Sequence, residues 1–297
     1  MHDHGGGRDG RRLLAVAALL TAFLAAEVLV AVVVSSLALL ADAGHMLTDV
    51  LALVFAAGAA RLAQRPVTDR WTFGLGRVEV LSAAVNGVTL LVVAAVVLVE
   101  SVRRLVDPPD VAGAPVAITA VAGLAVNVVA TMVLLRADRQ SLNVAAAIAH
   151  VVTDAYAFAA TLVAGVVVAT TGFTRADPIA SLVVVVLMLR SSSSLLRRSG
   201  AVLLDRTPEG VDLAELRDHL VESAHVIDVH DLHAWTVGSG LPAVSAHVVV
   251  APECFSGGDA PQLLDELQQC LVGHFDVAHS TFQLEAAGHV DHEPGTH

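Results

Sequence analysis

Charged side chains are scarce in this chain of 297 residues, and lysine is absent altogether. Charged residues make up 15% of the sequence, against about a quarter in an ordinary soluble domain. Hydrophobic residues make up 55%, and the mean hydropathy is +0.70. All 17 basic residues are arginines, which we attribute to a bias in genomic composition. This composition excludes an ordinary soluble domain and indicates a membrane protein.

Cysteine is almost as rare, since the chain contains only Cys254 and Cys270. Two cysteines without a pattern are too few for a disulfide framework. The sequence also lacks a His-Glu-x-x-His helix, which is typical of zinc hydrolases, and it lacks kinase, nuclease and DNA-binding motifs. We therefore expect a protein that is not an enzyme, with no organic cofactor and no nucleic-acid partner.

The charges that are present are unevenly distributed. Residues 1–200 contain 15 of the 17 arginines, whereas residues 201–297 contain 16 of the 29 acidic residues and ten of the 14 histidines. Such a break in charge predicts a domain boundary near residue 200. We expect a membrane domain at 13–200 after a short tail at 1–12, a second domain at 201–286, and a disordered tail at 287–297.

Six apolar runs in the first 200 residues are long enough to cross about 30 Å of hydrocarbon as helices. They cover approximately residues 13–34, 36–62, 78–102, 114–135, 142–170 and 178–196. The first run is too long for the core of a signal peptide and has no persuasive cleavage site, so we interpret it as a span. The runs predict an all-α membrane domain of six helices, with both termini on one side.

The arginines predict the orientation of these spans. Counted near the span ends, thirteen lie on the side of the N-terminus, and only Arg103, Arg104 and Arg175 lie on the opposite side. Cytoplasmic loops carry the excess of basic residues in membrane proteins. We therefore expect a multi-pass protein of the cell membrane with cytoplasmic N- and C-termini.

Two of the apolar runs contain the same polar motif, His-x-x-Thr-Asp. It occurs as His45 to Asp49 in the second run and as His150 to Asp154 in the fifth. A spacing of i, i+4 places each histidine and aspartate on one face of a helix. Both motifs fall near the middle of the bilayer, where an ionised aspartate costs roughly 2.5–3.5 kcal/mol.

A divalent cation would offset that cost. Two imidazoles and two carboxylates suit tetrahedral Zn²⁺ better than Mg²⁺ or Ca²⁺, which prefer shells of oxygen. A site at the midplane of a helical bundle is where alternating-access carriers bind their cargo, and protons compete for the same ligands. The motifs thus predict a carrier that exchanges a metal ion for protons. The alternative is a pair of buried His–Asp hydrogen bonds that hold helices together.

These residues resemble a known family. The motif Ser36-Leu-Ala-Leu-Leu-Ala-Asp-Ala-Gly-His-Met-Leu-Thr-Asp49, the turn Phe73-Gly-Leu-Gly-Arg-Val-Glu79 and His150-x-x-x-Asp154 are similar to those of the cation diffusion facilitator family of metal/proton antiporters. The resemblance covers about residues 13–285. It implies six membrane helices, a cytoplasmic ferredoxin-like domain, a homodimer and export of Zn²⁺ from the cytoplasm. His45 resembles the zinc-preferring branch, with Cd²⁺ and Co²⁺ as minor cargoes.

The loop between the second and third runs departs from some members of that family, which bind an additional zinc ion there with an acid and two histidines. The corresponding positions in this chain are Thr68, Trp71 and Leu75, so that only Asp69 could coordinate. We expect no metal site in this loop. We expect Phe73 to Gly76 to form a tight turn that starts the third helix.

The second domain has the pattern of a small α+β fold. Residues 211–223 and 261–273 are amphipathic helices, and residues 226–237, 243–250 and 279–285 have the alternation of strands. The order αββαβ predicts a three-stranded sheet with its helices on one face, in agreement with the ferredoxin-like domain that the resemblance implies.

The resemblance also implies a metal site in this domain. His230, His247 and Glu285 are the expected ligands, with His279 as a further candidate, and Gln283 stands where some relatives carry another histidine. His233 lies three residues after His230, so in a regular strand the two would face opposite ways. The alternative is that these histidines simply face solvent.

Some assignments stay open at this level. Glu27, Asn86 and Asn127 could line an ion path or form hydrogen bonds between helices. The competing functions are a membrane metal sensor and an intramembrane zinc hydrolase. Both are disfavoured, because the chain lacks a signalling motif and because both aspartates are needed as metal ligands. The sequence does not predict the ratio of protons to metal, the resting conformation or the number of ions in the second domain.

Overall fold

The computed structural model describes residues 6–33, 37–107, 113–137, 142–238, 241–277 and 279–289. The chain forms two compact units, Met1–Gly200 and Ala201–His297. Residues 1–5 and 290–297 of the two predicted tails lie outside the described residues, whereas residues 6–12 of the first tail form the beginning of a long helix.

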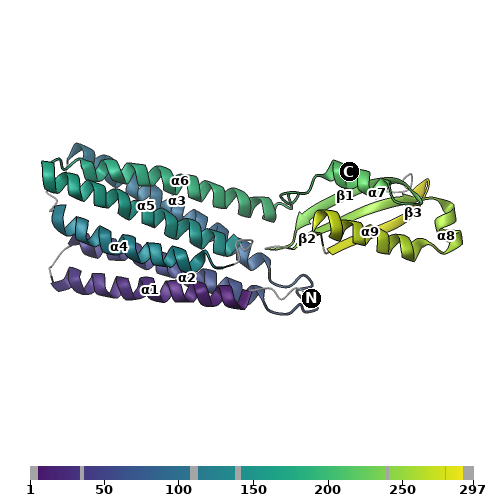
Figure 1. Cartoon of the computed structure of the whole chain (residues 1–297), viewed down its shortest axis with the longest axis horizontal. Helices are drawn as coiled ribbons and strands as arrows, with labels where there is room; N and C mark the ends of the chain where they lie inside the picture. Colours follow the sequence, from purple (N-terminus) through teal and green to yellow (C-terminus); the bar gives the residue numbers. More distant parts are fainter. Residues whose placement is uncertain are drawn as a thin grey trace. The chain divides into compact units, whose positions relative to one another are not determined.

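The described part of the first unit consists of six long helices (Figure 1). They are α1 (Gly6–Val33), α2 (Leu37–Ala63), α3 (Arg77–Val106), α4 (Gly113–Leu134), α5 (Leu142–Thr171) and α6 (Ala176–Leu203). The loop before α3 turns at Gly74, whose φ of +73° is readily adopted only by glycine. Glu79 in the first turn of α3 and Arg103 and Arg104 in its last turn are placed favourably for the helix dipole.

Among the described residues, four helices are long and apolar enough to cross a membrane. They are α3, residues 117–134 of α4, residues 144–171 of α5, and α6. Their outward faces carry large apolar side chains such as Val96, Ile118 and Val186, which are 63%, 71% and 64% exposed. Such surfaces are unfavourable in water and favourable in lipid. The unit is therefore a multi-pass membrane domain.

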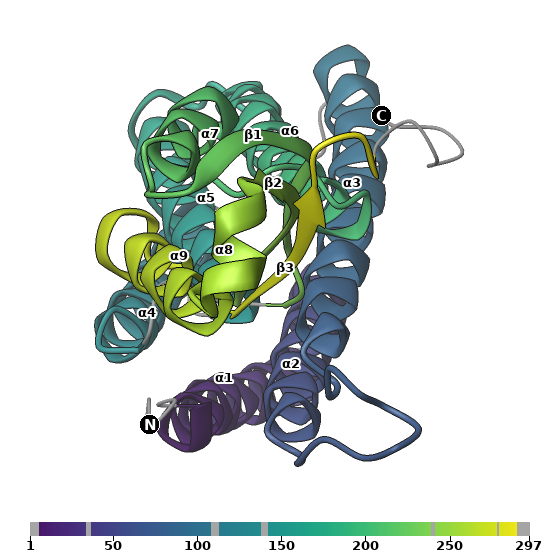
Figure 2. The same cartoon turned by 90° about the vertical axis from the view of Figure 1, so that its right-hand side faces the viewer.

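The helices of this unit pack in neighbouring pairs. Helix α1 lies beside α2 and α4 lies beside α5 (Figures 1 and 2), and α2 also contacts α3 and α5. Their shared core is formed by buried leucines, valines and alanines. Helix α6 packs against α3, where the Ser192 Oγ donates a hydrogen bond to the Gly87 carbonyl at 2.8 Å. A Cβ at Gly87 would lie 3.0 Å from Leu196, so glycine allows this close approach.

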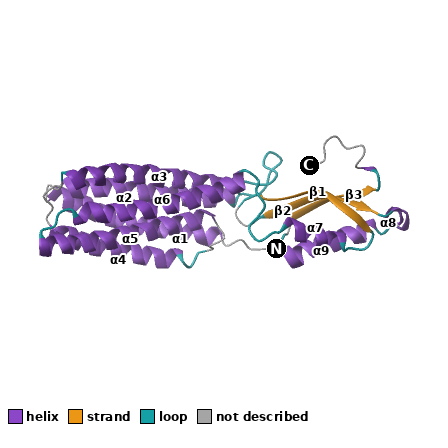
Figure 3. Ribbon diagram, turned by 90° about the horizontal axis from the view of Figure 1, so that it is seen from above, coloured by secondary structure: helices purple, strands orange, loops and turns teal. Residues whose placement is uncertain are grey.

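The second unit is a three-stranded sheet covered by helices. Its elements are α7 (Leu213–Val221), β1 (Val226–Thr236), β2 (Pro242–Val250), α8 (Pro252–Gly257), α9 (Ala260–Phe275) and β3 (His279–Ala286). The strand order is β1-β2-β3, with β1 antiparallel and β3 parallel to β2. Helices α7 and α9 lie on one face of the sheet (Figure 3).

The sequence pattern did not predict the short helix α8. It begins at Pro252 and ends at Gly257, and the next residue, Gly258, caps it with a φ of +83°. Proline fits the first turn because no intrahelical bond needs its missing N–H, and a left-handed glycine closes the last turn. Apart from the additional helix α8, the elements follow the expected order αββαβ.

Strand β1 contains an irregularity that corrects one expectation. His230 pairs with His247 and His233 pairs with Ser245, so β1 has one residue more than β2 in this interval. Asp231 takes up the extra residue with a φ of +48°. Because His247 and Ser245 are two residues apart, His230 and His233 share one face of the sheet. The expectation that they face opposite ways is wrong, since it assumed a regular strand.

Candidate metal sites

A group of three potential ligands lies inside the membrane domain, between α2 and α5. Asp49, on α2, approaches His150, on α5, with 2.8 Å between its Oδ1 atom and the imidazole Nε2. Asp154, one turn further along α5, places its Oδ2 atom 3.7 Å from the same nitrogen. One ligand atom from each residue lies within 4.8 Å of the others. Both Asp49 and His150 are only 6% exposed.

The spacing of these atoms suits a tetrahedral ion. Zinc binds nitrogen and oxygen at about 2.0–2.1 Å, so neighbouring ligand atoms in a tetrahedron are about 3.3–3.4 Å apart. The observed 2.8 and 3.7 Å lie on either side of that value. Small rotations of the side chains would therefore bring the three atoms to zinc-binding positions. Magnesium and calcium, which require six or more oxygens, fit this donor set poorly.

Small residues form part of the core that α2 and α5 share with α1 and α4. This core includes Ala56, Ala57 and Ala60 on α2 and Ala147 on α5, all buried. Small side chains allow the backbones of membrane helices to approach closely. Such packing favours short distances between polar side chains on neighbouring helices.

A cavity of about 120 Å³ adjoins the two aspartates. Asp49, Asp154 and Asn127 supply its acidic and amide groups, and Met46 and Phe158 are among its apolar walls. The Asn127 Nδ2 donates a hydrogen bond to the Gly123 carbonyl at 3.1 Å. Its buried Oδ1 has no hydrogen-bond partner among the described residues. The amide that the sequence left without a role therefore belongs to the wall of the cavity beside the carboxylates and has an acceptor without a partner among the described residues.

The other polar residues that the sequence singled out in the membrane domain are not part of the described ligand group. His45 lies on α2, four residues before Asp49 and hence on the same face of the helix. Its side chain and that of Glu27 lie outside the described part of the structure. Asn86 lies on α3 with a buried Oδ1 atom and is absent from the walls of the cavity.

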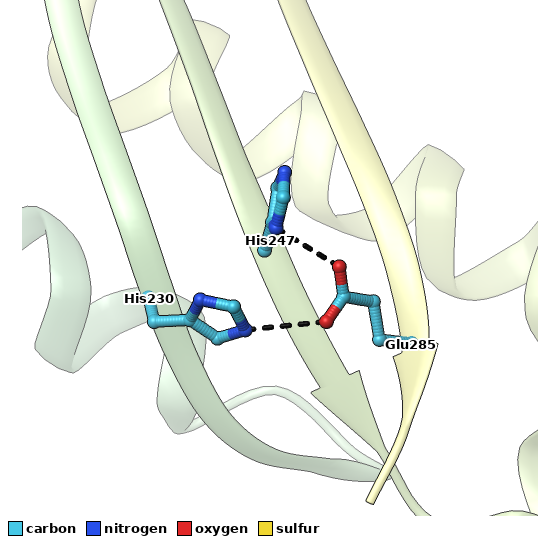
Figure 4. A group of neighbouring side chains, drawn as sticks. All are labelled: His230, His247 and Glu285. Atoms are coloured by element: carbon cyan, nitrogen blue, oxygen red, sulfur yellow. Dashed lines mark hydrogen bonds and ion pairs between the residues drawn. The ribbon is translucent and has the colours of Figure 1, made fainter. Parts of the chain in front are cut away.

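A second group of ligands comes from the three strands of the sheet in the second unit (Figure 4). His230 comes from β1, His247 from β2 and Glu285 from β3. Alternate residues of β2 from Val244 to Val250 are buried against the helices, so His247 projects from the other face. Pairing of His230 with His247 and of Val249 with Glu285 then places all three side chains together.

The carboxylate of Glu285 lies between the two imidazoles. Its Oε2 is 3.2 Å from the His230 Nε2, and its Oε1 is 2.9 Å from the His247 Nδ1. Burial acts to raise the pKa of Glu285, but a hydrogen bond from Gln283 and the neighbouring His247 and His230 hold it below its usual value. Glu285 is therefore ionised at neutral pH and can bind a cation.

Gln283 has a clear position at this site. Its Nε2 donates a hydrogen bond to the Glu285 Oε1 at 2.7 Å. An amide nitrogen donates protons and does not bind metal ions. Gln283 therefore orients the carboxylate and does not supply a ligand through its nitrogen.

His279 and His233 are not part of this three-residue group. His279 pairs with Ala243 at the start of β3. Six residues at about 3.3 Å each separate it from Glu285, roughly 20 Å along the strand. A shared ion is excluded at that distance, which the sequence pattern alone did not reveal. His233 shares the face of His230 but directs its Nε2 to the Asp231 Oδ1 at 3.0 Å.

Both parts of the chain match family models. Residues 13–204 match the cation efflux transmembrane domain, and residues 208–287 match the cation efflux protein, cytoplasmic domain. The matched ranges meet near the border between the two compact units.

Similar curated proteins cover nearly the whole chain. The zinc transporter ZitB of Escherichia coli is 39% identical over 93% of this chain and 88% of its own length. The metal cation efflux system protein CzcD of Cupriavidus metallidurans is 37% identical over 96% of this chain and 89% of its own length. A cadmium, cobalt and zinc/H(+)-K(+) antiporter of Bacillus velezensis is 33% identical over 97% and 92%. The solved metal-bound C-terminal domain of the CzcD transporter, 36% identical, covers 25% of this chain and 99% of its own, with a TM-score of 0.23.

Proposed function

Because the chain belongs to the cation efflux family and is a metal efflux transporter, not an enzyme, we propose that it exports Zn²⁺ from the cytoplasm in exchange for protons. Its ligand set of imidazole and carboxylate favours zinc, and Cd²⁺ and Co²⁺ are secondary cargoes because they accept the same ligands. The names of the relatives agree with these three ions.

The observation that carries this proposal is the group of Asp49, His150 and Asp154 between α2 and α5. Two carboxylates and an imidazole buried together in a lipid-facing bundle are costly without a bound cation. We propose that His45 is the fourth ligand, because it lies one turn from Asp49 on the same face of α2. The cavity beside the aspartates provides room for the ion to enter or leave.

We propose that all six long helices span the cell membrane, with both termini and the ferredoxin-like second unit in the cytoplasm. The distribution of arginines supports this orientation. In this arrangement α2 and α5 run in opposite directions, and their motifs meet near the midplane. A site at that depth serves a carrier because access can alternate from one side to the other.

Exchange with protons follows from the chemistry of the ligands. Histidine binds zinc only when neutral and aspartate only when ionised, so binding of the metal expels protons. Protons that enter from the outside would displace zinc outward, and cytoplasmic zinc would displace the protons inward. The site then alternates between a metal-bound and a protonated state.

Growth on zinc provides the first test of this function. Expression of the chain in a host that lacks its own zinc exporters should restore growth at toxic zinc concentrations and lower the zinc content of the cells. Growth on toxic Mg²⁺ or Ca²⁺ should not improve, because the site lacks the oxygen shell that these ions require. An unchanged zinc content in cells that carry the protein in their membrane would contradict the proposal.

We propose that His230, His247 and Glu285 bind zinc in the cytoplasmic domain and that this domain joins two copies of the chain. The separations of 2.9 and 3.2 Å between the carboxylate oxygens and the imidazole nitrogens are close to the spacing of ligands in a tetrahedral zinc site. The sheet face that carries them is not covered by α7 or α9. A metal bound there could report cytoplasmic zinc to the transporter.

The substitution Glu285→Gln should remove one equivalent of bound zinc from the purified full-length protein. The amide keeps the shape of the carboxylate but removes its charge. Side chains that only hydrogen-bond to metal ligands already contribute 10–100-fold to metal affinity, so loss of a direct ligand should weaken zinc binding by about 100-fold or more. Equilibrium dialysis with Asp49→Asn and Asp154→Asn in the background isolates the cytoplasmic site. The exposed Glu266 of α9 supplies the control, Glu266→Gln. Equal zinc content in the two variants would exclude Glu285 as a ligand.

A further inference from the structure

A cavity of about 310 Å³ lies between α5 and α6 in the membrane domain, with Ala83 of α3 also in its lining. It shares no residue with the cavity beside the two aspartates. Its wall on α5 consists of Ala145, Ala149, Val152, Thr153 and Tyr156. Most of these residues are spaced by three or four positions, so they occupy one face of the helix. The cavity therefore extends as a groove along α5.

The wall formed by α6 is basic. Arg190, Ser194 and Arg198 follow one another at intervals of four residues, and all three are exposed. They form a row on one face of α6, in which the two arginines are separated by about 12 Å along the helix axis. No aspartate or glutamate lines the groove, and within the described part of the chain neither arginine forms an ion pair. The groove therefore has two positive charges that no acidic side chain balances.

Buried hydroxyl groups complete the lining. Thr153 of α5 and Ser191 of α6 share a hydrogen bond of 3.2 Å, which joins the two helices. Ser199 is only 1% exposed, and its Oγ has no hydrogen-bond partner among the described residues. Buried hydroxyl groups in proteins usually have a partner. The Ser199 Oγ is therefore a donor that a ligand in the groove can use.

The two arginines determine the charge of that ligand. A groove with two guanidinium groups and no acid repels a metal cation, so it does not suit the transported ion. Arg190 also lies within the apolar run 178–196, where a charge is costly unless it reaches the membrane surface or meets an opposite charge. Guanidinium groups bind phosphate through paired hydrogen bonds. The lining thus fits a phosphate group.

The surroundings of the groove favour a lipid as the source of this phosphate. Both α5 and α6 are long and apolar enough to cross a membrane, and Val152, Leu187 and Leu195 give the groove apolar walls. In the orientation proposed above, this end of α6 leads to the cytoplasm. The cytoplasmic leaflet contains anionic lipids, and basic pockets between membrane helices on that side bind their headgroups. A soluble phosphate ion would leave the apolar walls uncovered.

We propose that the groove between α5 and α6 binds the phosphate headgroup of an anionic phospholipid. Arg190 and Arg198 are the charged contacts, and Ser194 and Ser199 donate hydrogen bonds. A bound lipid contacts α5, the helix that carries two of the metal ligands, so the lipid composition of the membrane influences the transport site. The choice of the cytoplasmic leaflet rests on the proposed orientation, whereas the binding site itself does not.

Native mass spectrometry of the purified full-length protein tests this site. The protein in a neutral detergent is titrated with phosphatidylglycerol or with phosphatidylcholine of the same acyl chains. Phosphatidylglycerol should bind more tightly by about tenfold or more, because it alone carries a net negative charge. Equal affinity for the two lipids would overturn the proposal. Inorganic phosphate at the same concentration should not displace the lipid, and displacement would also overturn the proposal by identifying free phosphate as the ligand.

Charge and shape are then changed separately. Arg190→Gln combined with Arg198→Gln should abolish the preference for phosphatidylglycerol. The control pair, Arg197→Gln with Arg206→Gln, removes the same charge from exposed positions outside the lining and should preserve the preference. Ser194→Trp keeps both arginines but fills the groove, so it should also abolish tight binding.

A preference for phosphatidylglycerol that survived either the double arginine change or Ser194→Trp would contradict the site. Thermal melting of each variant without added lipid shows whether its fold is intact, and Ser194 is exposed, so its replacement should leave the helix core unchanged. None of these measurements involves zinc, so a failure of the lipid site is distinguishable from a failure of the proposed transport.

Discussion

Asp49→Asn or Asp154→Asn should abolish zinc export. Each change keeps the shape of the side chain and removes one of the negative charges that hold the cation between α2 and α5. Side chains that only hydrogen-bond to metal ligands contribute 10–100-fold to metal affinity. Loss of a direct ligand should therefore weaken zinc binding by about 100-fold or more. With the site nearly empty at cellular zinc concentrations, the variants should fail to restore growth on zinc, and zinc uptake into inverted membrane vesicles should fall to background.

Asp69→Asn is the matched control for these variants. Asp69 lies in the exposed loop before α3, far in sequence from either motif, and we expect its loss to change uptake less than twofold. Membrane fractionation must show equal amounts of all three variants, because an unpaired buried His150 could also impair folding. Zinc transport that survived both Asp49→Asn and Asp154→Asn would refute the assignment of the site.

Collapse of the pH gradient should stop zinc uptake into inverted vesicles of cells that express the chain. In these vesicles the cytoplasmic face is outside and the lumen is acidified by respiration, so outward protons drive zinc inward. Each imidazole ligand must lose its proton to bind the metal, and apparent affinity falls about tenfold per competing proton for each pH unit below the pKa of that ligand. An acidic lumen therefore releases zinc from the site, and an uncoupler should reduce uptake by at least tenfold.

The reverse measurement separates exchange from an indirect effect of the gradient. Addition of zinc to acidified vesicles should raise the luminal pH, reported by a fluorescent dye, in the presence of the wild-type chain but not of Asp154→Asn. Zinc uptake at the same rate with and without a pH gradient would show that metal and protons move independently. Because the Asp154→Asn vesicles generate the same gradient, they exclude a general leak of protons.

The sequence predicted the helices and strands well because their signals are local. Apolar runs of 19 or more residues predict the positions of α1 to α6, although α1 begins seven residues before its run and α6 ends seven residues after its run, and alternation predicts β1 to β3. The helix α8 was missed, because its six residues are too short for a periodic pattern and its boundaries depend on Pro252 and the left-handed Gly258. Length and hydropathy predict six spans, and four helices among the described residues are long and apolar enough to cross a membrane.

For the two groups of potential metal ligands, the sequence predicted less and the tertiary structure decided more. The i, i+4 spacing predicted that His150 and Asp154 share a face, but only packing of α5 against α2 places Asp49 2.8 Å from His150. The bulge at Asp231 turned His233 to the face of His230, against the expectation from alternation. The position of His279 required the parallel register of β3, which pairs it with Ala243.

By itself, the sequence determined which part of the chain is a membrane domain, which residues are available as ligands and which face of a helix carries them. Composition and helical period are local properties, so they can be read from the sequence. The tertiary structure decided which of these residues meet. His219 and His274 are 55 positions apart and share no motif, yet packing of α7 beside α9 on the sheet brings their rings to 5.3 Å. Contacts between residues distant in the chain depend on packing and register, which no local pattern encodes.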